Sequence, residues 1–310
     1  MKKLLTLLLA SICFIATAQP INTPKKIITP LPVGSGPDVL ARKIAENLSK
    51  QWNHQVIVDN RPGGSGTIAL DVYLAESAAP QSIYLAPNDN FTSHPTLYDT
   101  QKYTQAMKMV SPVFKGDLVL FASPEVTDWQ SLVALSKQRL SFGSWGIGSN
   151  AHIAGLELAD YLGSSAVHVP YRDYNQWFID VSSKQLLYSF GTVASTAKLE
   201  KAGKIKYLAF SSDKRDPDYP NVPTLKELIG RNIGSPVWAA VYVHSNTSEA
   251  TVNKLQQDIQ AAIKSAAVQE TISALNYRSW SATPGDFEKQ VRNDFELFRR
   301  ASTKFNVTIK

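Results

Sequence analysis

The sequence predicts an α/β fold of two lobes, each built from alternating strands and helices. Three observations lead to this expectation. Short apolar runs alternate with amphipathic, helix-like stretches along most of the chain, which favours a parallel sheet in each half. About 290 residues follow an apolar leader, more than a single core usually organises. A glycine-rich break between a strand and a helix occurs once in each half, as "PLPVGSGPD" and as "FGSWGIGSN".

The first residues have the pattern of a secretory signal peptide. Lys2 and Lys3 form a short basic region, an apolar run follows, and Ala16-Thr17-Ala18 is an A-x-A cleavage site. The run is too short to span a bilayer. We therefore expect a signal peptide over residues 1–18, cleaved after Ala18, and export to the periplasm. The only cysteine, Cys13, lies in this leader, and a mature chain of this size needs no disulfide in an oxidising compartment.

Composition argues against several classes of function. Without Lys2 and Lys3, the 32 basic side chains fall to 30 against 26 acidic ones, a mild surplus of +4 that is spread along the chain. No stripe of Lys and Arg interleaved with aromatic residues occurs, so we expect no nucleic-acid partner. The five histidines form no i,i+4 pair and no H-E-x-x-H motif, so we expect no metal and no cofactor.

The elements of the first half follow in chain order. A strand over 27–29 precedes a helix with an apolar stripe at helical spacing, formed by Leu40, Ala41, Ile44, Ala45, Leu48 and Trp52. A strand over 56–59 enters the turn-rich loop "NRPGGSG", and a helix over about 67–76 and the strand "SIYLAP" come next. After the strand "DLVLFAS", Thr127-x-x-Gln130 is a capping box that opens a helix reaching about residue 138.

The second half continues the alternation and then changes character. Strands "LSFGS", "AVHVPY", "LLYSFG" and "IKYLAFSS" alternate with helices over 151–162, 175–182 and 195–201. The connection "SDKRDPDYPNVPT" leads to a capping-box helix at Thr224-x-x-Glu227 and to the apolar strand "VWAAVYVH". Two amphipathic helices end the chain, and we expect them to pack back on an earlier domain. The last helix places Phe287, Val291, Phe295 and Phe298 on one face.

The two glycine-rich turns are candidate anion seats. A strand ending in such a turn leaves the first amides of the next helix unpaired, and the helix dipole adds about half a positive charge there. In the first turn, Gly34 and Gly36 let the backbone approach a ligand. Pro37 suits a first helical position. Asp38 can favour the helix start or accept a hydrogen bond from a ligand.

The second turn has the same design. It contains Gly143, Gly146 and Gly148, with Ser144, Ser149 and Asn150 as short polar donors. Glycine-rich turns also serve as plain tight connections, but two of them in an exported chain without a nucleophile or metal motif favour a ligand cleft. We expect His152, at the start of the following helix, to hydrogen-bond its own loop.

The chain resembles the Bug family, periplasmic solute-binding receptors associated with tripartite tricarboxylate transporters. The resembling stretches, in the family's order and spacing, are "ITPLPVGSGPDVLARKIAENLSKQWNHQVIVDNRPGGSGTIALD", "LSFGSWGIGSNAHIAG", "VHVPYRD" and "KAGKIKYLAFSSDKRDPDYPNVPTLKE". This resemblance implies a two-lobed, type II-like Venus flytrap that is not an enzyme and closes on a small carboxylate. The expected lobes are residues 19–121 plus 236–310, and residues 122–235, joined by two crossover strands.

The resemblance also implies where the ligand lies. Loops matching residues 30–38 and 142–150 would grip a carboxylate through backbone amides, hydroxyls and waters. The full candidate site consists of Pro32, Gly34, Ser35, Gly36, Asp38, Asn88, Ser144, Trp145, Gly146, Ser149, Asn150, Tyr171, Arg172 and Thr192. The closed form, expected to be a monomer, would be recognised by a membrane permease or by the outer domain of a sensor kinase.

Departures from the family pattern bear on ligand identity. Pro37 removes one amide donor from the first turn. Trp145 and Ile147 stand where small and polar residues are common, Arg172-Asp173 replaces a usual Lys-Gly, and Gly191 replaces a frequent Asp. An indole in the cleft either stacks on an aromatic or planar ligand or shrinks the pocket. The expected ligand is a small carboxylate, such as an aromatic or a dicarboxylic acid.

Individual motifs point to three other functions. Gly146-x-Gly148-x-x-Ala151 follows a strand, opens a helix and is succeeded by a strand leading to Arg172-Asp173, as in a dinucleotide-binding oxidoreductase with an acidic residue for the ribose. Its place in mid-chain and the export signal argue against that class. Ser144-x-Gly146 is half of a hydrolase nucleophile elbow, and Phe142 occupies the place of the first glycine. A receptor for a neutral amide stays open, because backbone amides and waters can also hold such a ligand.

Overall fold

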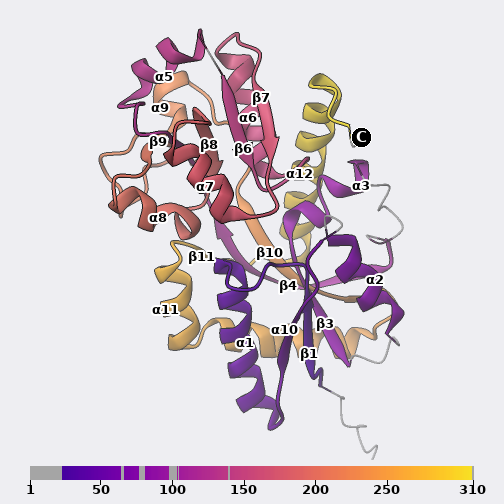
Figure 1. Cartoon of the computed structure of the whole chain (residues 1–310). Coiled ribbons are helices and arrows are strands. Elements are labelled where there is room, and N and C mark those ends of the chain that lie inside the picture. Colours follow the sequence, from indigo (N-terminus) through magenta and orange to yellow (C-terminus); the bar gives the residue numbers. More distant parts are fainter. Residues whose placement is uncertain are drawn as a thin grey trace, which may run out of the picture.

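The computed structural model describes residues 23–63, 66–76, 81–97, 103, 105–138 and 140–308. These residues form two lobes, each with its own sheet and its own flanking helices (Figure 1). The expected signal peptide lies outside the described residues. None of the described helices combines the length and the apolar character needed to cross a membrane.

The first lobe is built on a six-stranded mixed sheet with the order β11-β4-β10-β3-β1-β2. Its strands are β1 (Lys26–Thr29), β2 (Ile57–Asn60), β3 (Ser82–Pro87), β4 (Met107–Gly116), β10 (Val237–His244) and β11 (Arg278–Ser279). β1 pairs in parallel with β2 and β3. β10 runs antiparallel to both β3 and β4, so the chain returns from the second lobe into the middle of the first sheet.

The second lobe has a five-stranded sheet with the order β7-β6-β8-β5-β9. Its strands are β5 (Val119–Ala122), β6 (Ser141–Ser144), β7 (Val167–Pro170), β8 (Tyr188–Gly191) and β9 (Lys206–Phe210). β6 pairs in parallel with β7 and β8, whereas β5 is antiparallel to β8 and β9. The expectation of a wholly parallel sheet in each half is therefore wrong for β5, β10 and β11. β5 and β10 enter by crossing between the lobes rather than through a βα unit, and the short β11 pairs antiparallel with β4.

The chain crosses between the lobes at two places. The first crossing is Asp117–Leu118, between β4 and β5, and the second is Ser235–Pro236, just before β10. The expected boundary at residue 121 falls inside β5, which belongs to the second sheet. Leu118 and Leu120 already pack in the core of the second lobe. The polar break Lys115-Gly116-Asp117 precedes Leu118 and marks the position at which the chain crosses.

Helices cover both faces of the first sheet. They are α1 (Gly36–Trp52), α2 (Thr67–Ala75), η2 (Asn88–Asn90), α3 (His94–Leu97), α10 (Glu249–Ile263) and α11 (Ala266–Ala274). The apolar stripe predicted for α1 is buried from Leu40 to Leu48 and shares one core with Leu255 and Ile259 of α10. Tyr73 of α2 packs with Tyr84 of β3 in a separate core.

The second lobe contains α5 (Trp129–Ser136), α6 (Asn150–Tyr161), α7 (Tyr174–Ser182), α8 (Val193–Lys201) and α9 (Leu225–Ile229). The predicted capping box of Thr224 and Glu227 opens α9. The box predicted at Thr127-x-x-Gln130 is wrong by one residue. Asp128 caps α5 and pairs with Ser131, because its carboxylate accepts the Ser131 backbone N–H at 2.8 Å.

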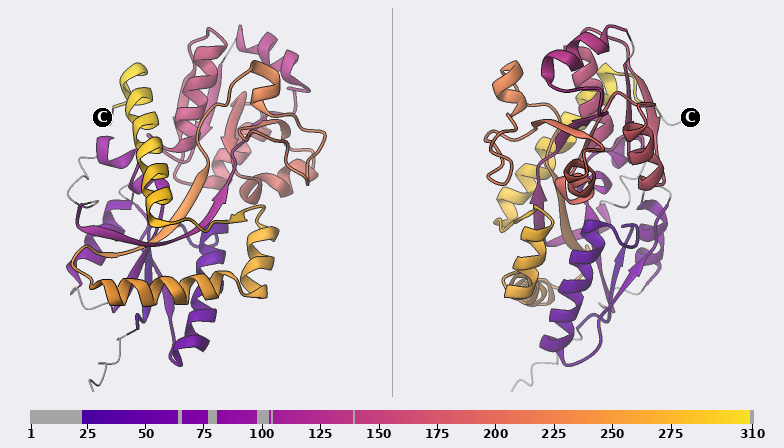
Figure 2. Two further views of the ribbon diagram at one scale, coloured as in Figure 1. Left: turned by 180° about the vertical axis from the view of Figure 1, so that it is seen from behind. Right: turned by 60° about the vertical axis from the view of Figure 1, so that its left-hand side comes forward.

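The C-terminal helix α12 (Pro284–Lys304) runs from the first lobe along the second (Figure 2). Near its start, Phe287 packs against Trp238 with 5.1 Å between ring centroids. Near its end, Phe298 packs on Ile153 of α6, and Lys304 Nζ lies 2.6 Å from Asp160 Oδ2. The expectation that this helix packs back on an earlier domain is confirmed: its first half packs on the first lobe and its second half on the second lobe. The chain ends in three helices rather than two, since α11 separates α10 from α12.

β4 was not predicted, although it is a ten-residue strand. Lys108, Lys115 and Pro112 interrupt its apolar pattern. Pro112 lies where the pairing with β10 shifts register, between Ala239 and Ala240. A proline is tolerated at such an irregularity because the ladder needs no N–H there.

Candidate functional site

The first glycine-rich turn connects β1 to α1 at the carboxyl end of β1. Ser35 caps α1 through its Oγ, which accepts the Asp38 backbone N–H at 3.4 Å. Gly34 has a φ of 80°, a left-handed conformation that favours glycine. Pro37 lies in the first turn of the helix, where its missing N–H costs little. Among the described residues the Gly36 N–H has no backbone partner, so this amide is available to a ligand.

Asp38 holds the first turn in shape. Its carboxylate is 1% exposed. Oδ2 accepts the Gly34 backbone N–H at 2.8 Å and Arg42 Nε at 3.1 Å, and Oδ1 accepts Asn60 Nδ2 at 2.7 Å. Both oxygens therefore have partners within the first lobe. Of the two roles expected for Asp38, these contacts favour stabilisation of the start of α1 over a bond to a ligand. Pro32 lies exposed at the rim of this turn.

The second glycine-rich turn connects β6 to α6. Ser149 caps α6: its Oγ accepts the His152 backbone N–H at 3.2 Å and donates to the Gly146 carbonyl at 2.8 Å. Ser144 Oγ also donates to the Gly146 carbonyl, at 2.9 Å. Gly146 and Gly148 have φ values of 144° and 80°. These bonds fix the turn from within and leave its backbone close to the other lobe.

Two stacked histidines support the second turn. His152 Nδ1 accepts the Gly148 backbone N–H at 3.0 Å, as expected for a residue that binds its own loop. Its ring stacks on His168 with 3.8 Å between centroids, and His168 Nε2 lies 2.8 Å from Ser144 Oγ. Burial lowers the pKa of His152 to about 4. Burial and the neighbouring His152 lower the pKa of His168 to about 3. Both rings are therefore neutral at pH 7.

The second turn contacts the end of β3 in the first lobe. Trp145 Nε1 donates to Asp89 Oδ2 at 3.2 Å. Asn88 Nδ2 donates to Asn150 Oδ1 at 3.2 Å, and Asn150 Nδ2 donates to the carbonyl of Ser235 at the second crossing at 3.0 Å. The structure thus brings together three of the expected site residues, Asn88, Trp145 and Asn150, as links between the lobes.

The first turn also meets the opposite lobe. A Cβ added to Gly36 would lie 3.3 Å from Ala194 Cβ on α8 and 3.5 Å from Tyr277 Oη. Burial raises the pKa of Tyr277 to about 12, an effect opposed by a hydrogen bond with Thr192. The start of α1 and the start of α8 therefore face each other, with Thr192 of the expected site between the lobes.

Tyr171 and Arg172 are placed differently. Tyr171 Oη donates to Asp180 Oδ2 of α7 at 2.5 Å, within the second lobe. Arg172 is exposed, and Asp173 caps α7 by accepting the Asn175 backbone N–H at 2.8 Å. The acidic residue that a dinucleotide site would need for a ribose is therefore used as a helix cap.

Asp89 is a site residue that the sequence reasoning missed. It belongs to η2, directly after β3, and is 7% exposed. Burial raises its pKa to about 7, opposed by hydrogen bonds from the Trp145 indole and the Asn150 backbone amide. The available signal was the polar run "NDN" at the carboxyl end of an apolar strand, the edge at which open α/β sheets bind ligands.

The Ser144–His168 pair does not form a nucleophile and base. Ser144 is fully buried, and its hydroxyl donates to the Gly146 carbonyl. His168 stacks on His152, so the pair supports the geometry of the turn. Within the described ranges no group of three or more metal-ligating side chains occurs.

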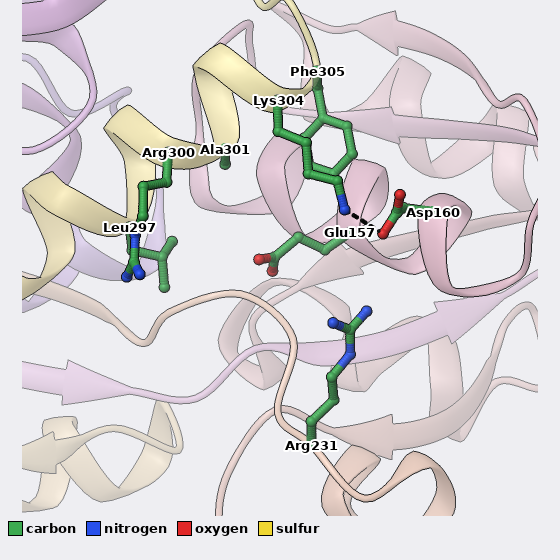
Figure 3. A pocket seen from close by; sticks show the side chains of 8 residues that line it. All are labelled: Glu157, Asp160, Arg231, Leu297, Arg300, Ala301, Lys304 and Phe305. Atoms are coloured by element: carbon green, nitrogen blue, oxygen red, sulfur yellow. Dashed lines mark hydrogen bonds and ion pairs between the residues drawn. The ribbon is translucent and has the colours of Figure 1, made fainter.

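A polar hollow of about 310 Å³ lies between α6 and α12, away from the two glycine-rich turns (Figure 3). Its charged lining residues are Glu157, Asp160, Arg231, Arg300 and Lys304. Lys304 is paired with Asp160, and Glu157 Oε2 accepts the Gly234 backbone N–H at 2.7 Å. The hollow therefore contains two acidic and three basic side chains, of which Asp160 and Lys304 form an ion pair, at the joint where α12 reaches the second lobe.

Comparison with protein families identifies a match over most of the chain. The sequence model of the tripartite tricarboxylate transporter family receptor matches residues 40–303. Protein BugT of Bordetella pertussis is 27% identical over 301 residues, covering 90% of this chain and 91% of BugT.

Two solved structures have a similar fold. The periplasmic binding protein BugD superposes with a TM-score of 0.81 at 23% identity, covering 93% of this chain and 99% of BugD. The R. palustris protein Rpa4515 with adipate superposes with a TM-score of 0.83 at 21% identity, covering 93% of this chain and 99% of that protein. The two-lobed fold of a solute-binding protein is thus confirmed.

Proposed function

Because this chain belongs to the tripartite tricarboxylate transporter receptor family, we propose that it binds a small carboxylate between its two glycine-rich turns. The observation that carries the proposal is the placement of two helix starts. α1 and α6 belong to different lobes, each follows a glycine-rich turn, and each turn contacts the opposite lobe. Helix starts attract anions through unpaired amides and the helix dipole. The similar fold of a protein bound to adipate supports the same class of ligand.

Ligand capture follows from the contacts between the lobes. Gly36 meets Ala194 on one side, and Trp145 meets Asp89 on the other. These contacts exist only when the lobes are together, so a ligand that touches both turns binds the closed form more tightly and shifts the population toward it. The closed receptor is the form that a membrane permease or the outer domain of a sensor kinase would bind.

We place the mature protein in the periplasm, as a monomer without catalytic activity. The family assignment supports a receptor that hands its ligand to a transporter. A hand-over needs a transient interface, and a closed receptor can present one that the open form lacks.

Thermal unfolding of the mature chain, stripped of carried-over ligand, tests the proposal. The panel contains mono-, di- and tricarboxylates, aromatic acids and the matching amides. At a thousandfold excess over Kd a true ligand stabilises by about 4 kcal/mol. At about 2 °C or more per kcal/mol, this is a shift of about 8 °C or more. A shift with amides but with no acid would refute the carboxylate assignment.

A variant tests whether the ligand-induced rise in unfolding temperature requires closure of the two lobes. Gly36→Val would place its side chain against Ala194 and Tyr277, so the lobes could not meet at the first turn. We expect the variant to lose the ligand-induced shift. Gly285→Ala is the matched control, because Gly285 lies in α12 with open space around it. An unchanged shift in Gly36→Val would place the ligand elsewhere.

A further inference from the structure

Asp89 is a buried acid with an unused oxygen at the contact between the lobes. Oδ2 accepts Trp145 Nε1 at 3.2 Å, and the Asn150 backbone amide at the start of α6 lies near enough to lower the pKa of this carboxylate. Oδ1 is buried and has no hydrogen-bond partner in the part of the chain that the structure describes. An unpaired buried carboxylate oxygen is costly, so this atom is suited to accept a donor from a bound molecule.

The charges around Asp89 do not neutralise it. Among the described residues, no cation contributes to its electrostatic environment. The titratable groups within reach are Asp294 of α12, which disfavours a second negative charge, and Tyr174 of α7. The other contacts are the neutral donors of Trp145 and Asn150. The cleft therefore contains one carboxylate of the protein's own, without a counter-ion.

This arrangement changes what the second turn can bind. The start of α6 is an anion seat, and Asp89 already occupies it from the opposite lobe through the Asn150 amide. The anion of the first turn, Asp38, is paired with Arg42 and Asn60 of its own lobe, and the Gly36 amide is available. A ligand carboxylate therefore fits the first turn, while a second carboxylate near Asp89 would be repelled.

We propose that Asp89 selects ligands that combine one carboxylate with a protonated amine, the carboxylate binding at the first turn and the ammonium donating to Asp89 Oδ1. This inference rests on the proposed function and narrows its ligand class to amino-carboxylates. The ammonium supplies both the donor that Oδ1 lacks and the positive charge that the cleft lacks.

Calorimetry with matched probe pairs tests the selection. Each pair keeps one carboxylate and exchanges the far group between ammonium and carboxylate: γ-aminobutyrate with succinate, δ-aminovalerate with glutarate, and p-aminomethylbenzoate with terephthalate. We expect the wild-type protein at pH 8 to prefer the amino member of its best pair by at least about tenfold. Asp89→Asn should remove this preference.

Asp294→Asn is the matched control. Asp294 is also a buried acid, but both of its oxygens have donors, Trp238 Nε1 at 2.7 Å and Gln290 Nε2 at 3.0 Å. Because Asp294 acts on Asp89 only through its charge, its substitution should lower the ratio within each pair much less than Asp89→Asn does. If the ratio of the two affinities falls equally in Asp89→Asn and Asp294→Asn, the preference for amines comes from the overall negative charge of the region, and the inference is overturned.

A measurement on the wild-type protein alone keeps the test decisive if Asp89→Asn does not fold. The pKa of Asp89 near 7 means that this carboxylate gains its proton between pH 8 and pH 6, whereas the probes keep their charges. The preference for amines should therefore fall several-fold at pH 6. Equal or tighter binding of the dicarboxylate at pH 8 overturns the Asp89 inference and leaves the carboxylate receptor standing. If neither member of any pair binds and only amides raise the unfolding temperature, both the Asp89 inference and the carboxylate receptor are overturned.

Discussion

The free energy of unfolding should fall between pH 7 and pH 5, and replacing His152 with glutamine should make this fall smaller by about 2 kcal/mol. The folded protein keeps His152 neutral, because its ring is buried and its Nδ1 accepts the Gly148 N–H. Its pKa is about 4 in the folded chain, against an ordinary value near 6.5. Between these values the unfolded chain binds a proton that the folded chain does not, so this stability is complete above pH 6.5 and is lost as the pH falls toward 4.

The size of this loss in stability follows from the distance between the assay pH and the pKa of His152 in the unfolded chain. At pH 5 the unfolded histidine is about 1.5 pH units below its pKa, which corresponds to about 2 kcal/mol at 1.36 kcal/mol per unit. His168 adds a loss of similar size, since its pKa is about 3. Asp89 acts in the opposite direction: its pKa of about 7 favours folding as the pH falls from 7 toward 4. The total curve therefore mixes both signs, and the difference between variants isolates His152.

Urea unfolding at pH 7 and pH 5 provides the assay. The wild-type protein should lose about 2 kcal/mol more between the two pH values than His152→Gln does. Glutamine retains an oxygen that can accept the Gly148 N–H. His54→Gln is the control, because His54 lies on the first lobe beside Thr23, far from this pair in sequence and in contacts. If His152→Gln and the wild-type protein lose the same free energy, His152 is not held neutral and the reasoning fails.

Two further substitutions test the contacts between the lobes. Trp145→Phe keeps the ring but removes the N–H that reaches Asp89, so it should cost about 1–3 kcal/mol and weaken ligand binding. Trp177→Phe removes a comparable bond to Ser189 within the second lobe and should lower the urea midpoint without changing Kd; equal effects on Kd would refute a special role for Trp145. Phe298→Ala should cost about 3–5 kcal/mol in urea unfolding, because the ring is fully buried against α6, and a loss under 1 kcal/mol would contradict that packing.

Local patterns in the sequence predicted the parts of the fold that local interactions decide. The apolar stripe of α1 and the capping box of α9 depend on spacing within one helix, and both are found as expected. The direction of β5 and β10 depends on which lobe the chain comes from, and no local pattern contains this information. β4 was missed because Pro112 and two lysines break its pattern, although a register shift in the pairing accommodates the proline.

The candidate site also has a part that the local sequence predicts and a part that depends on tertiary contacts. Both turns and the bond from His152 to its own loop follow from short-range chemistry, so they could be read from the residues. Asp89 could not be recognised, because an acid in a polar run looks like a surface residue until the second lobe covers it. Tertiary contact alone gives it the Trp145 partner and the uncompensated charge.

The central position of β10 in the first sheet determines which lobe can be completed first during folding. The ribosome makes the chain from its N-terminus, so every strand of the second sheet, over 119–210, exists before β10 at Val237–His244. β10 separates β3 from β4 in the first sheet, so these two strands have no bridge until that late segment arrives. The first lobe thus depends on contacts between residues more than a hundred positions apart, a slow class of folding step. The second lobe can be complete while the sheet of the first lobe still lacks its central strand, which leaves the joining of the lobes as the last step.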